Sequence, residues 1–244
     1  YSMKLEIAKY LDVTYLKTAD ELSTSNKENK KNVLNVILQA IEMSAACIMI
    51  RPEYVQLARE QILEHKSSVV IGTVVDFPFG NSSANEKVSQ ALVAINNGAT
   101  DIDFVCDYNS FKRGSFDKFD ADVLSGTEIV ISHKKTVKWI IETGALSKKE
   151  IRAITLRIYT LLSPIYFKNL KDIFIKTSTG YYGGSGANIK DIKTIKSVCG
   201  NLSVKASWGV SDLKSSLEKI EAGVTRIGTS KAQNIYNESL KNEL

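Results

Sequence analysis

Residues 172–177 read Asp-Ile-Phe-Ile-Lys-Thr, and residues 202–206 read Leu-Ser-Val-Lys-Ala. Each run is short and largely apolar with one lysine near its end, which is typical of a strand buried in a parallel sheet rather than of a half-exposed strand. Similar runs recur along the chain at residues 8–14, 45–50, 68–75, 101–107, 137–143 and 224–228. The sequence therefore predicts a set of buried strands spread over the whole chain.

Amphipathic stretches separate these runs and predict helices. In residues 84–97 the apolar side chains recur at helical spacing, and Gly98 follows as a C-terminal stop. The other predicted helices cover residues 28–43, 52–65, 115–133, 147–162, 188–198, 211–222 and 230–241. Strands that are each followed by a helix, in this number, predict an α/β fold of the TIM (β/α)8 barrel type. The alternative is an open doubly wound sheet, but a chain of 244 residues leaves little room for its extra edges.

The composition is that of an ordinary globular chain. Hydrophobic residues make up 43% and charged residues 24%, and no linker divides the chain, so residues 1–244 are expected to form one domain. Tyr1 and Ser2, which precede Met3, are expected to be a cloning remnant without a role in the fold. No apolar run reaches about 18 residues and no signal-peptide layout is present, so no membrane partner is expected.

Charge, cysteine and histidine usage narrow the function classes. The net charge is only +5 and the basic residues are spread out, so no nucleic-acid partner is expected. The cysteines show no paired spacing, which predicts a reducing, cytoplasmic location. The two histidines, His65 and His133, fall at predicted helix ends, which removes the central part of a histidine zinc site and of a Ser-His-Asp triad. The chemistry is therefore expected to use lysine, carboxylate or cysteine.

Lys176 is the most informative residue. It ends an apolar run and precedes Thr177-Ser178-Thr179-Gly180. A lysine in a buried strand is costly unless its charge is paired or removed, and burial lowers its pKa. A neutral amine attacks carbonyls and forms a Schiff base. The alternative is a structural ion pair with a barrel carboxylate.

Two further residues favour catalysis at Lys176. Lys205 lies on the next predicted strand, about 4.8 Å away, so two amines that face the barrel interior disfavour double ionisation and one of them should be neutral near pH 7. Asp103, within Ile102-Asp103-Phe104-Val105, can move protons or balance the lysine charges. Together they predict an imine-forming enzyme.

Other polar residues lie near predicted strand ends. Asp12 lies within the first predicted strand, and Asp107 is a weaker candidate for proton transfer than Asp103. Lys138 and Glu142 are expected to pair with each other as a supporting shell. Cys47 is more typical of a small buried hydrophobe than of a nucleophile, since no histidine or helix start is evident beside it.

Glycines suggest an anion site. They cluster at Gly180, Gly183, Gly184 and Gly186 after Lys176, and recur at Gly209 and Gly228. Barrel loops after the last strands commonly bind phosphate with backbone N–H groups at a helix N-terminus. Combined with paired lysines, these loops predict a phosphorylated carbonyl substrate.

At these residues the chain resembles the deoxyribose-phosphate aldolases, a family of Schiff-base (class I) aldolases, from about Tyr10 to Ile235. The most specific segment is Phe174-Ile175-Lys176-Thr177-Ser178-Thr179-Gly180, which is similar to the family's segment around its Schiff-base lysine. The other similar segments are Leu11-Asp12-Val13-Thr14, Phe77-Pro78-Phe79-Gly80-Asn81, Ile102-Asp103-Phe104-Val105, Ile140-Ile141-Glu142-Thr143-Gly144, Val204-Lys205-Ala206-Ser207 and Arg226-Ile227-Gly228-Thr229-Ser230.

The resemblance implies reversible cleavage of 2-deoxyribose 5-phosphate to glyceraldehyde 3-phosphate and acetaldehyde, without metal or cofactor. Lys176 would attack the C1 carbonyl, Lys205 would lower the pKa of Lys176, and Asp103 would relay protons through water. The implied partners are the phosphorylated sugar and the aldehydes. A homodimer is allowed as the assembly. The residues implied to line the substrate or phosphate pocket are Asp12, Cys47, Thr179, Gly180, Gly209 and Ser230.

The chain departs from the family pattern at four positions. Val13 replaces a histidine, Trp208 precedes Gly209 where the family has paired glycines, Ser211 replaces an arginine, and Lys231 replaces a second serine. The changes at Trp208 and Ser211 predict weaker phosphate binding, and Lys231 can supply a replacement charge. Two alternatives stay open: a Schiff-base aldolase with a shifted aldehyde preference, and a non-catalytic barrel that binds a phosphate metabolite.

Overall fold

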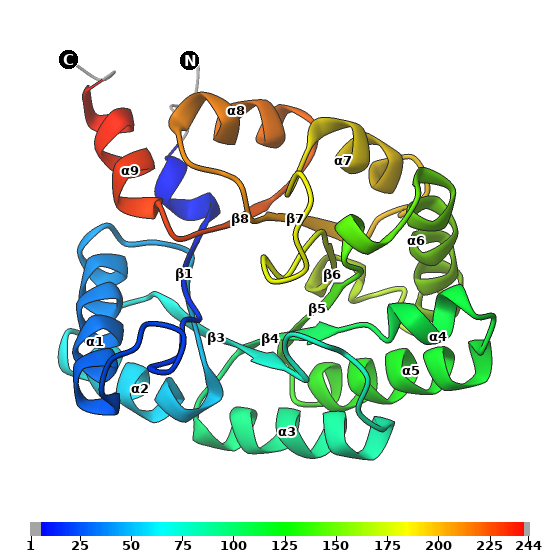
Figure 1. Cartoon of the computed structure of the whole chain (residues 1–244), viewed down its shortest axis with the longest axis horizontal. Coiled ribbons are helices and arrows are strands. Elements are labelled where there is room, and N and C mark those ends of the chain that lie inside the picture. The colour runs from blue at the N-terminus through cyan, green and yellow to red at the C-terminus, as the bar shows by residue number, and fades with distance from the viewer. Residues whose placement is uncertain (1–5, 242–244) are drawn as a thin grey trace.

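The computed structural model describes residues 6–241, which form a closed ring of parallel strands with helices around it (Figure 1). Each strand pairs with the next along the chain, and the last pairs with the first, so the sheet has no open edge. The fold is a TIM barrel, as predicted, and Tyr1 and Ser2 lie outside the described residues. The strands are β1 (Leu11–Tyr15), β2 (Cys47–Ile50), β3 (Val70–Val75), β4 (Asp101–Val105), β5 (Thr136–Ile140), β6 (Ile173–Lys176), β7 (Ser203–Ser207) and β8 (Arg226–Thr229).

The predicted helices are all present, shifted by a few residues at their ends. The α-helices are α1 (Asn26–Glu42), α2 (Val55–Glu64), α3 (Ala84–Asn97), α4 (Tyr108–Lys112), α5 (Phe116–Ser132), α6 (Lys148–Leu162), α7 (Ile189–Lys196), α8 (Leu213–Glu221) and α9 (Ala232–Lys241). Short 3-10 turns occur at Ile7–Tyr10, Pro52–Tyr54, Thr143–Ala145 and Leu170–Asp172. The sequence did not predict α4, because five residues are too few to show helical periodicity.

Local chemistry explains where the helices begin and end. Ser83 caps α3 and Ser147 caps α6, and each forms a reciprocal capping box with a glutamate three residues later. His65 and His133 are the C-terminal caps of α2 and α5, with ring nitrogens close to carbonyls of the preceding turn. The prediction that both histidines lie at helix ends is therefore confirmed.

An apolar layer fills the space between the strands and the helices. Trp139 stacks on Phe104 with ring centroids 4.7 Å apart. Gly126 of α5 permits this packing, because a side-chain carbon there would lie 2.8 Å from the Trp139 ring. Inside the ring of strands the side chains are different, since several of them are charged and fully buried.

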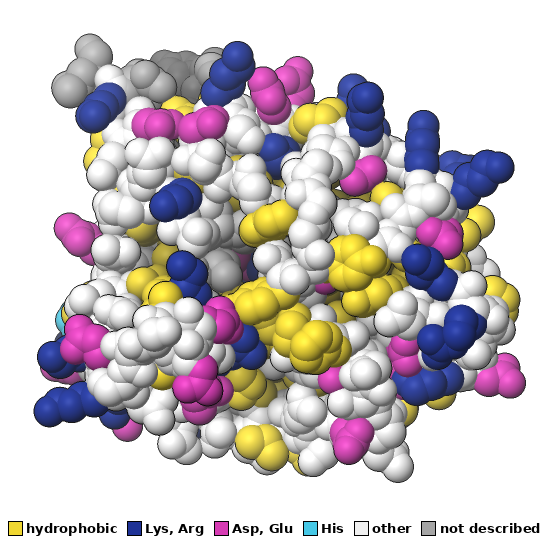
Figure 2. All heavy atoms as spheres, in the orientation of Figure 1, with side chains coloured by type: hydrophobic (Ala, Val, Ile, Leu, Met, Phe, Trp, Pro, Cys, Tyr) yellow, Lys and Arg dark blue, Asp and Glu magenta, His cyan; other side chains and the backbone are white. Residues whose placement is uncertain are grey.

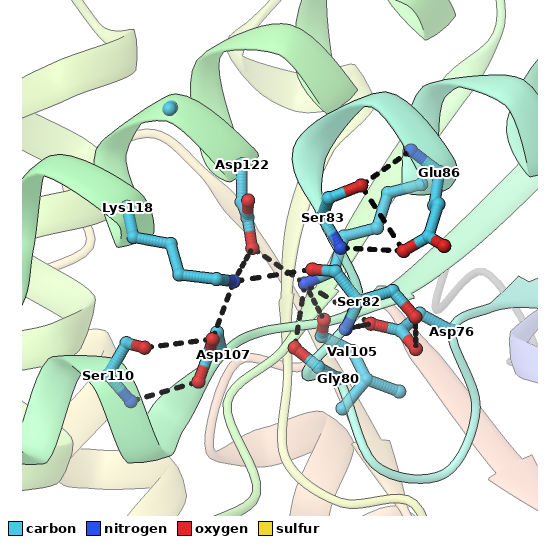
Figure 3. Close-up of polar contacts among 12 residues, drawn as sticks. Asp76, Gly80, Ser82, Ser83, Glu86, Val105, Asp107, Ser110, Lys118 and Asp122 are labelled. Carbon is cyan, nitrogen blue, oxygen red and sulfur yellow. Dashed lines mark hydrogen bonds and ion pairs between the residues drawn. The ribbon is translucent and has the colours of Figure 1, made fainter.

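Outside the ring of strands, a separate network of buried charges lies between α3, α5 and the loop after β3 (Figure 3). The Lys87 ammonium is fully buried and donates hydrogen bonds of 2.9 Å to the carbonyl oxygens of Gly80 and Val105 and to the Asp122 carboxylate. Val105 is the last residue of β4, and Gly80 belongs to the loop after β3. One ammonium therefore fixes this loop to the end of the neighbouring strand.

We expect Lys87→Met to lower the free energy of unfolding by about 3–5 kcal/mol, because two buried carbonyls and a buried carboxylate lose their donor. Urea denaturation measures this change. Lys31→Met is the control, since Lys31 forms an exposed pair with Glu28 and its loss should cost about 1 kcal/mol or less. Equal losses in the two variants would contradict this account of Lys87.

Candidate active site

The interior of the barrel brings together the residues that the sequence singled out on separate strands. In the strand register Asp103 of β4 lies beside Lys138 of β5, and Lys176 of β6 lies beside Lys205 of β7. Lys176 is 2% exposed and the other three side chains are not exposed at all. The prediction that Lys176 and Lys205 share the barrel interior is therefore confirmed.

Asp103 is the centre of this group. Its Oδ1 accepts a hydrogen bond of 2.9 Å from Lys138, and its Oδ2 accepts bonds of 2.9 Å from both Lys176 and Lys205. The amines of Lys176 and Lys205 therefore lie no further apart than twice that distance. Gly228 of β8 makes room for Lys205, because a side-chain carbon there would lie 2.9 Å from the Lys205 Cε.

Three further charged residues surround the group, and two of them were missed by sequence reasoning. Asp12 pairs with Lys205 at 2.6 Å and with Arg226 at 2.5 Å, and Asp101 pairs with Lys138 at 2.9 Å and with Arg226 at 2.5 Å. Asp101 and Arg226 begin β4 and β8, where a charge looks like an ordinary surface residue. Their role becomes visible only when the ring closes and brings β8 beside β1.

The charges of this interior do not balance. Four cationic side chains (Lys138, Lys176, Lys205 and Arg226) face three carboxylates (Asp12, Asp101 and Asp103). The interior therefore carries one surplus positive charge when every group is ionised, and a buried surplus charge is costly. The group that loses its proton most readily relieves this cost.

Asp12 and Asp103 stay ionised in the network. Burial by itself would raise the pKa of Asp12, but Arg226, Lys205 and Lys138 hold the pKa below its ordinary value. Burial opposes ionisation of Asp103 in the same way, yet the three lysines keep the pKa of this carboxyl well below its usual range. Asp103 can therefore accept hydrogen bonds from all three lysines at neutral pH.

Lys176 carries the lowered pKa. Burial lowers the pKa of Lys176 to about 8, Asp103 opposes this change, and Lys205 and Lys138 add to it. The pKa of Lys138 moves in the opposite direction, because Asp101, Asp103 and Asp12 outweigh its burial. Lys176 is therefore the amine that releases its proton.

Burial and Lys205 both lower the pKa of Lys176, as predicted, and burial is the larger cause. One detail of the sequence-based prediction needs correction. At a pKa of about 8 roughly one Lys176 in ten is neutral at pH 7, so the amine is mostly protonated there and not mostly neutral. This neutral fraction is still roughly 300 times that of an ordinary lysine.

The predicted pairing of Lys138 with Glu142 is wrong. Lys138 bonds to Asp101 and Asp103 inside the barrel, whereas Glu142 lies two residues beyond the end of β5 and accepts hydrogen bonds from the Thr179 hydroxyl and N–H. Glu142 has a φ of 58°, so the chain turns away from the strand direction after β5. Burial raises the pKa of Glu142, and the bonds from Thr179 and the charge of Lys176 oppose this rise.

A pocket of about 480 Å³ opens over the ends of β1, β6, β7 and β8. Of the residues predicted to contact substrate, it is lined by Thr179, Gly180, Gly209, Ser230 and Lys231. It is also lined by residues outside that prediction, among them Lys17, Tyr181 and Trp208.

The lining does not include Lys176, Lys205 or Asp103. Among the other candidates that lie away from it are Asp12, Cys47 and Asp107. Asp12 is fully buried in the charge network. Cys47 is fully buried, and burial raises the pKa of its thiol, so it stays protonated. Asp107 belongs to the network of Figure 3, where it pairs with Lys118 at 2.6 Å and caps α4 through Ser110.

Trp208 shapes one wall of the pocket. It has a φ of 71°, a left-handed conformation that costs a tryptophan about 1 kcal/mol or more and is free for glycine. A side-chain carbon at Gly180 would lie 3.0 Å from the Trp208 ring, and one at Gly186 would lie 2.7 Å from its carbonyl oxygen. Trp208 therefore fills space that depends on two glycines of the loop after β6.

Comparisons with known proteins show which family the chain is related to. A deoxyribose-phosphate aldolase of Staphylococcus epidermidis is 38% identical over 91% of this chain and 92% of its own length. The chain belongs to the deoxyribose-phosphate aldolase family. A relative of the same name from Thermococcus gammatolerans is 32% identical over 93% of both chains. No protein-family model matches the chain.

Solved structures agree with the fold. The structure named "QR15, an Aldolase" has a TM-score of 0.83 and 29% identity, with 98% of each chain covered. A deoxyribose phosphate aldolase of Aeropyrum pernix, described as a tetramer, has a TM-score of 0.76 over 98% of this chain and 92% of its own, at 24% identity. Within residues 6–241 no group of three or more His, Cys, Asp or Glu side chains could hold a metal ion, and no helix is long and apolar enough to span a membrane.

The geometry predicts how Lys205 tunes Lys176. Lys205→Met removes a positive neighbour that lowers the pKa of Lys176, so the pKa should rise above about 8, by about one unit or more. The rate at which Lys176 captures a small aldehyde, measured against pH, should then require more alkaline solution. An unchanged pH profile would contradict the assigned role of Lys205.

Proposed function

We propose that this protein is a Schiff-base aldolase that reversibly cleaves 2-deoxyribose 5-phosphate into glyceraldehyde 3-phosphate and acetaldehyde. The observation that carries the proposal is the buried Lys176 amine, whose pKa is lowered to about 8 beside Asp103 and Lys205. An amine of this kind is a nucleophile toward a carbonyl near neutral pH. The membership of the family supports the choice of sugar.

The reaction follows from this arrangement. The neutral Lys176 amine attacks C1 of the open-chain sugar, and loss of water from the carbinolamine gives an imine. The C3 hydroxyl then loses its proton, the C2–C3 bond breaks, and its electron pair moves toward the iminium as glyceraldehyde 3-phosphate leaves. Protonation of the resulting enamine at C2 and hydrolysis release acetaldehyde and regenerate Lys176. Asp103, as a carboxylate within hydrogen-bond distance of Lys176, carries the protons through water in this proposal.

The pocket supports a phosphorylated substrate. Lys17 lines it after β1, and Lys231 lines it at the start of α9, where Ser230 and Gly228 also contribute to the wall. A helix N-terminus and two cations are a favourable environment for a phosphate. In this proposal Lys231 replaces the cation that is absent at Ser211, and Trp208 narrows the approach.

The proposal includes small-molecule partners only and a cytoplasmic role in the breakdown of deoxyribose phosphates, and it allows for a homodimer. The three cysteines are free and buried, which supports a reducing location. Light scattering of the purified protein tests the dimer.

Trapping with borohydride tests the proposed function. Acetaldehyde and borohydride together should fix one ethyl group on Lys176, located by peptide mass spectrometry, because the reductant captures the imine. Lys176→Met should not be labelled, and Lys190→Met, which removes an exposed lysine of α7, should be labelled as the unaltered protein is.

The outcomes separate the alternatives. Absence of the adduct would favour a barrel that binds a phosphate metabolite without catalysis. An adduct without turnover of 2-deoxyribose 5-phosphate would favour an aldolase with a shifted aldehyde preference, with Trp208 as the residue to examine.

Lys231→Ala is expected to raise KM for 2-deoxyribose 5-phosphate about tenfold, because a cation beside the phosphate is lost. KM for unphosphorylated 2-deoxyribose should change less than about twofold. Steady-state kinetics with both sugars measure this ratio, and Lys190→Ala provides the control. Equal changes with both sugars would show that Lys231 does not contact the phosphate.

A further inference from the structure

The loop of residues 180–186, between β6 and α7, reaches over the middle of the ring of strands (Figure 1). It begins four residues after Lys176, and Gly180 and Tyr181 line the pocket. At its centre Gly183 and Gly184 have φ values of 101° and 94°, and a side chain at Gly183 would contact nothing. The carbonyl oxygen of Gly183 and the backbone of Gly184 lie against Gly144, so these glycines let the loop pack closely beside the segment after β5.

The start of the loop is anchored by the Tyr181 hydroxyl. This hydroxyl can donate its proton to the Leu16 carbonyl, at 3.1 Å, or to the Glu21 carboxylate, at 2.9 Å. Leu16 and Glu21 belong to the loop after β1, so the bond joins segments 160 residues apart in sequence. The loop after β6 is thereby fastened to the loop on the other side of the pocket, which Leu16 and Glu21 also line.

Arg51, from the segment after β2, supports this anchor. Its Nε donates a hydrogen bond of 2.7 Å to the same Leu16 carbonyl, and its guanidinium lies 3.5 Å from the Glu21 carboxylate. The guanidinium also lies 5.1 Å from the ring centroid of Phe77 and 5.7 Å from that of Tyr181. The two rings meet edge to face at 5.2 Å, so four loops converge on Tyr181.

The base of the loop is anchored beside the reactive amine. The Tyr181 N–H donates a hydrogen bond of 3.0 Å to the Thr179 hydroxyl oxygen, and Thr179 bonds to Glu142, whose carboxyl faces the charge of Lys176. In the space-filling view hydrophobic side chains gather around the middle of this face, over the region that the loop crosses (Figure 2). With the loop in this position Lys176 is only 2% exposed.

We propose that Tyr181 is a positioning residue that fastens the loop of residues 180–186 across the pocket and so retains the phosphorylated sugar over Lys176. The inference rests on the proposed function and adds the residue that controls retention of the substrate. Opening requires the Tyr181 hydroxyl to leave Leu16 and Glu21, and the glycines of the loop allow the movement. The Tyr181 hydroxyl bonds to Leu16 and Glu21 and not to a residue of the charge network inside the barrel, so the contact is expected to act on binding rather than on the chemical steps.

Tyr181→Phe tests this inference, because it removes the hydroxyl and keeps the ring against Phe77 and Arg51. KM for 2-deoxyribose 5-phosphate should rise about three- to tenfold, with kcat changed less than about twofold. The matched control is Tyr182→Phe, since Tyr182 is 54% exposed and its hydroxyl has no hydrogen bond within the described part of the chain. This control should leave both constants unchanged.

A double variant isolates the bond. Glu21→Ala alone should also raise KM, and its effect should be smaller in the Tyr181→Phe background, because both changes remove the bond between these two residues, whereas only Glu21→Ala removes the pair with Arg51. Fully additive effects of the two changes would overturn the inference. So would a Tyr181→Phe variant whose KM equals that of Tyr182→Phe.

Hydrogen exchange of the loop gives a readout that needs no turnover. The amides of residues 180–186 should exchange about tenfold faster in Tyr181→Phe than in the unaltered protein or in Tyr182→Phe. Unchanged exchange would overturn the inference even if KM rises, because the hydroxyl would then act on the substrate directly. Failure of the proposed function would appear separately, as absence of the borohydride adduct on Lys176 in the unaltered protein.

Discussion

The charge network inside the barrel depends on one shared carboxylate, that of Asp103. Asp103 accepts hydrogen bonds from Lys138, Lys176 and Lys205 at 2.9 Å each, and these residues come from four consecutive strands. Three ammonium groups would repel one another in a buried space without such a partner. The carboxylate holds them together, and the surplus positive charge falls on Lys176, whose pKa drops to about 8.

Closure of the barrel makes this arrangement possible. β8 pairs with β1, which brings Arg226 to Asp12 and Asp101 and so fixes the carboxylates that the lysines need. Gly228 leaves the space that the Lys205 side chain occupies. The charge network lies inside the ring of strands. The loops that follow β1, β6, β7 and β8 form the pocket.

The sequence predicted the barrel and the central residues because both leave strong local signals. A charge inside an apolar strand is conspicuous, which is why Lys176, Lys205 and Asp103 could be recognised before any geometry was known. Side chains that meet only because the barrel closes, or because two loops come together, leave no such signal in the sequence. The bond between Glu142 and Thr179 and the contact of Tyr181 with Glu21 join segments 37 and 160 residues apart, and neither follows from spacing along the chain.

The titration of the Lys176 amine tests the central claim most directly. Protein labelled with 15N in its lysine side chains gives one Lys176 signal, assigned by its absence in Lys176→Met, and its chemical shift reports the proton on the amine. The account predicts a midpoint at about pH 8, because burial and the neighbouring lysines outweigh Asp103. A midpoint near 10.5, the value of an ordinary lysine, would contradict it.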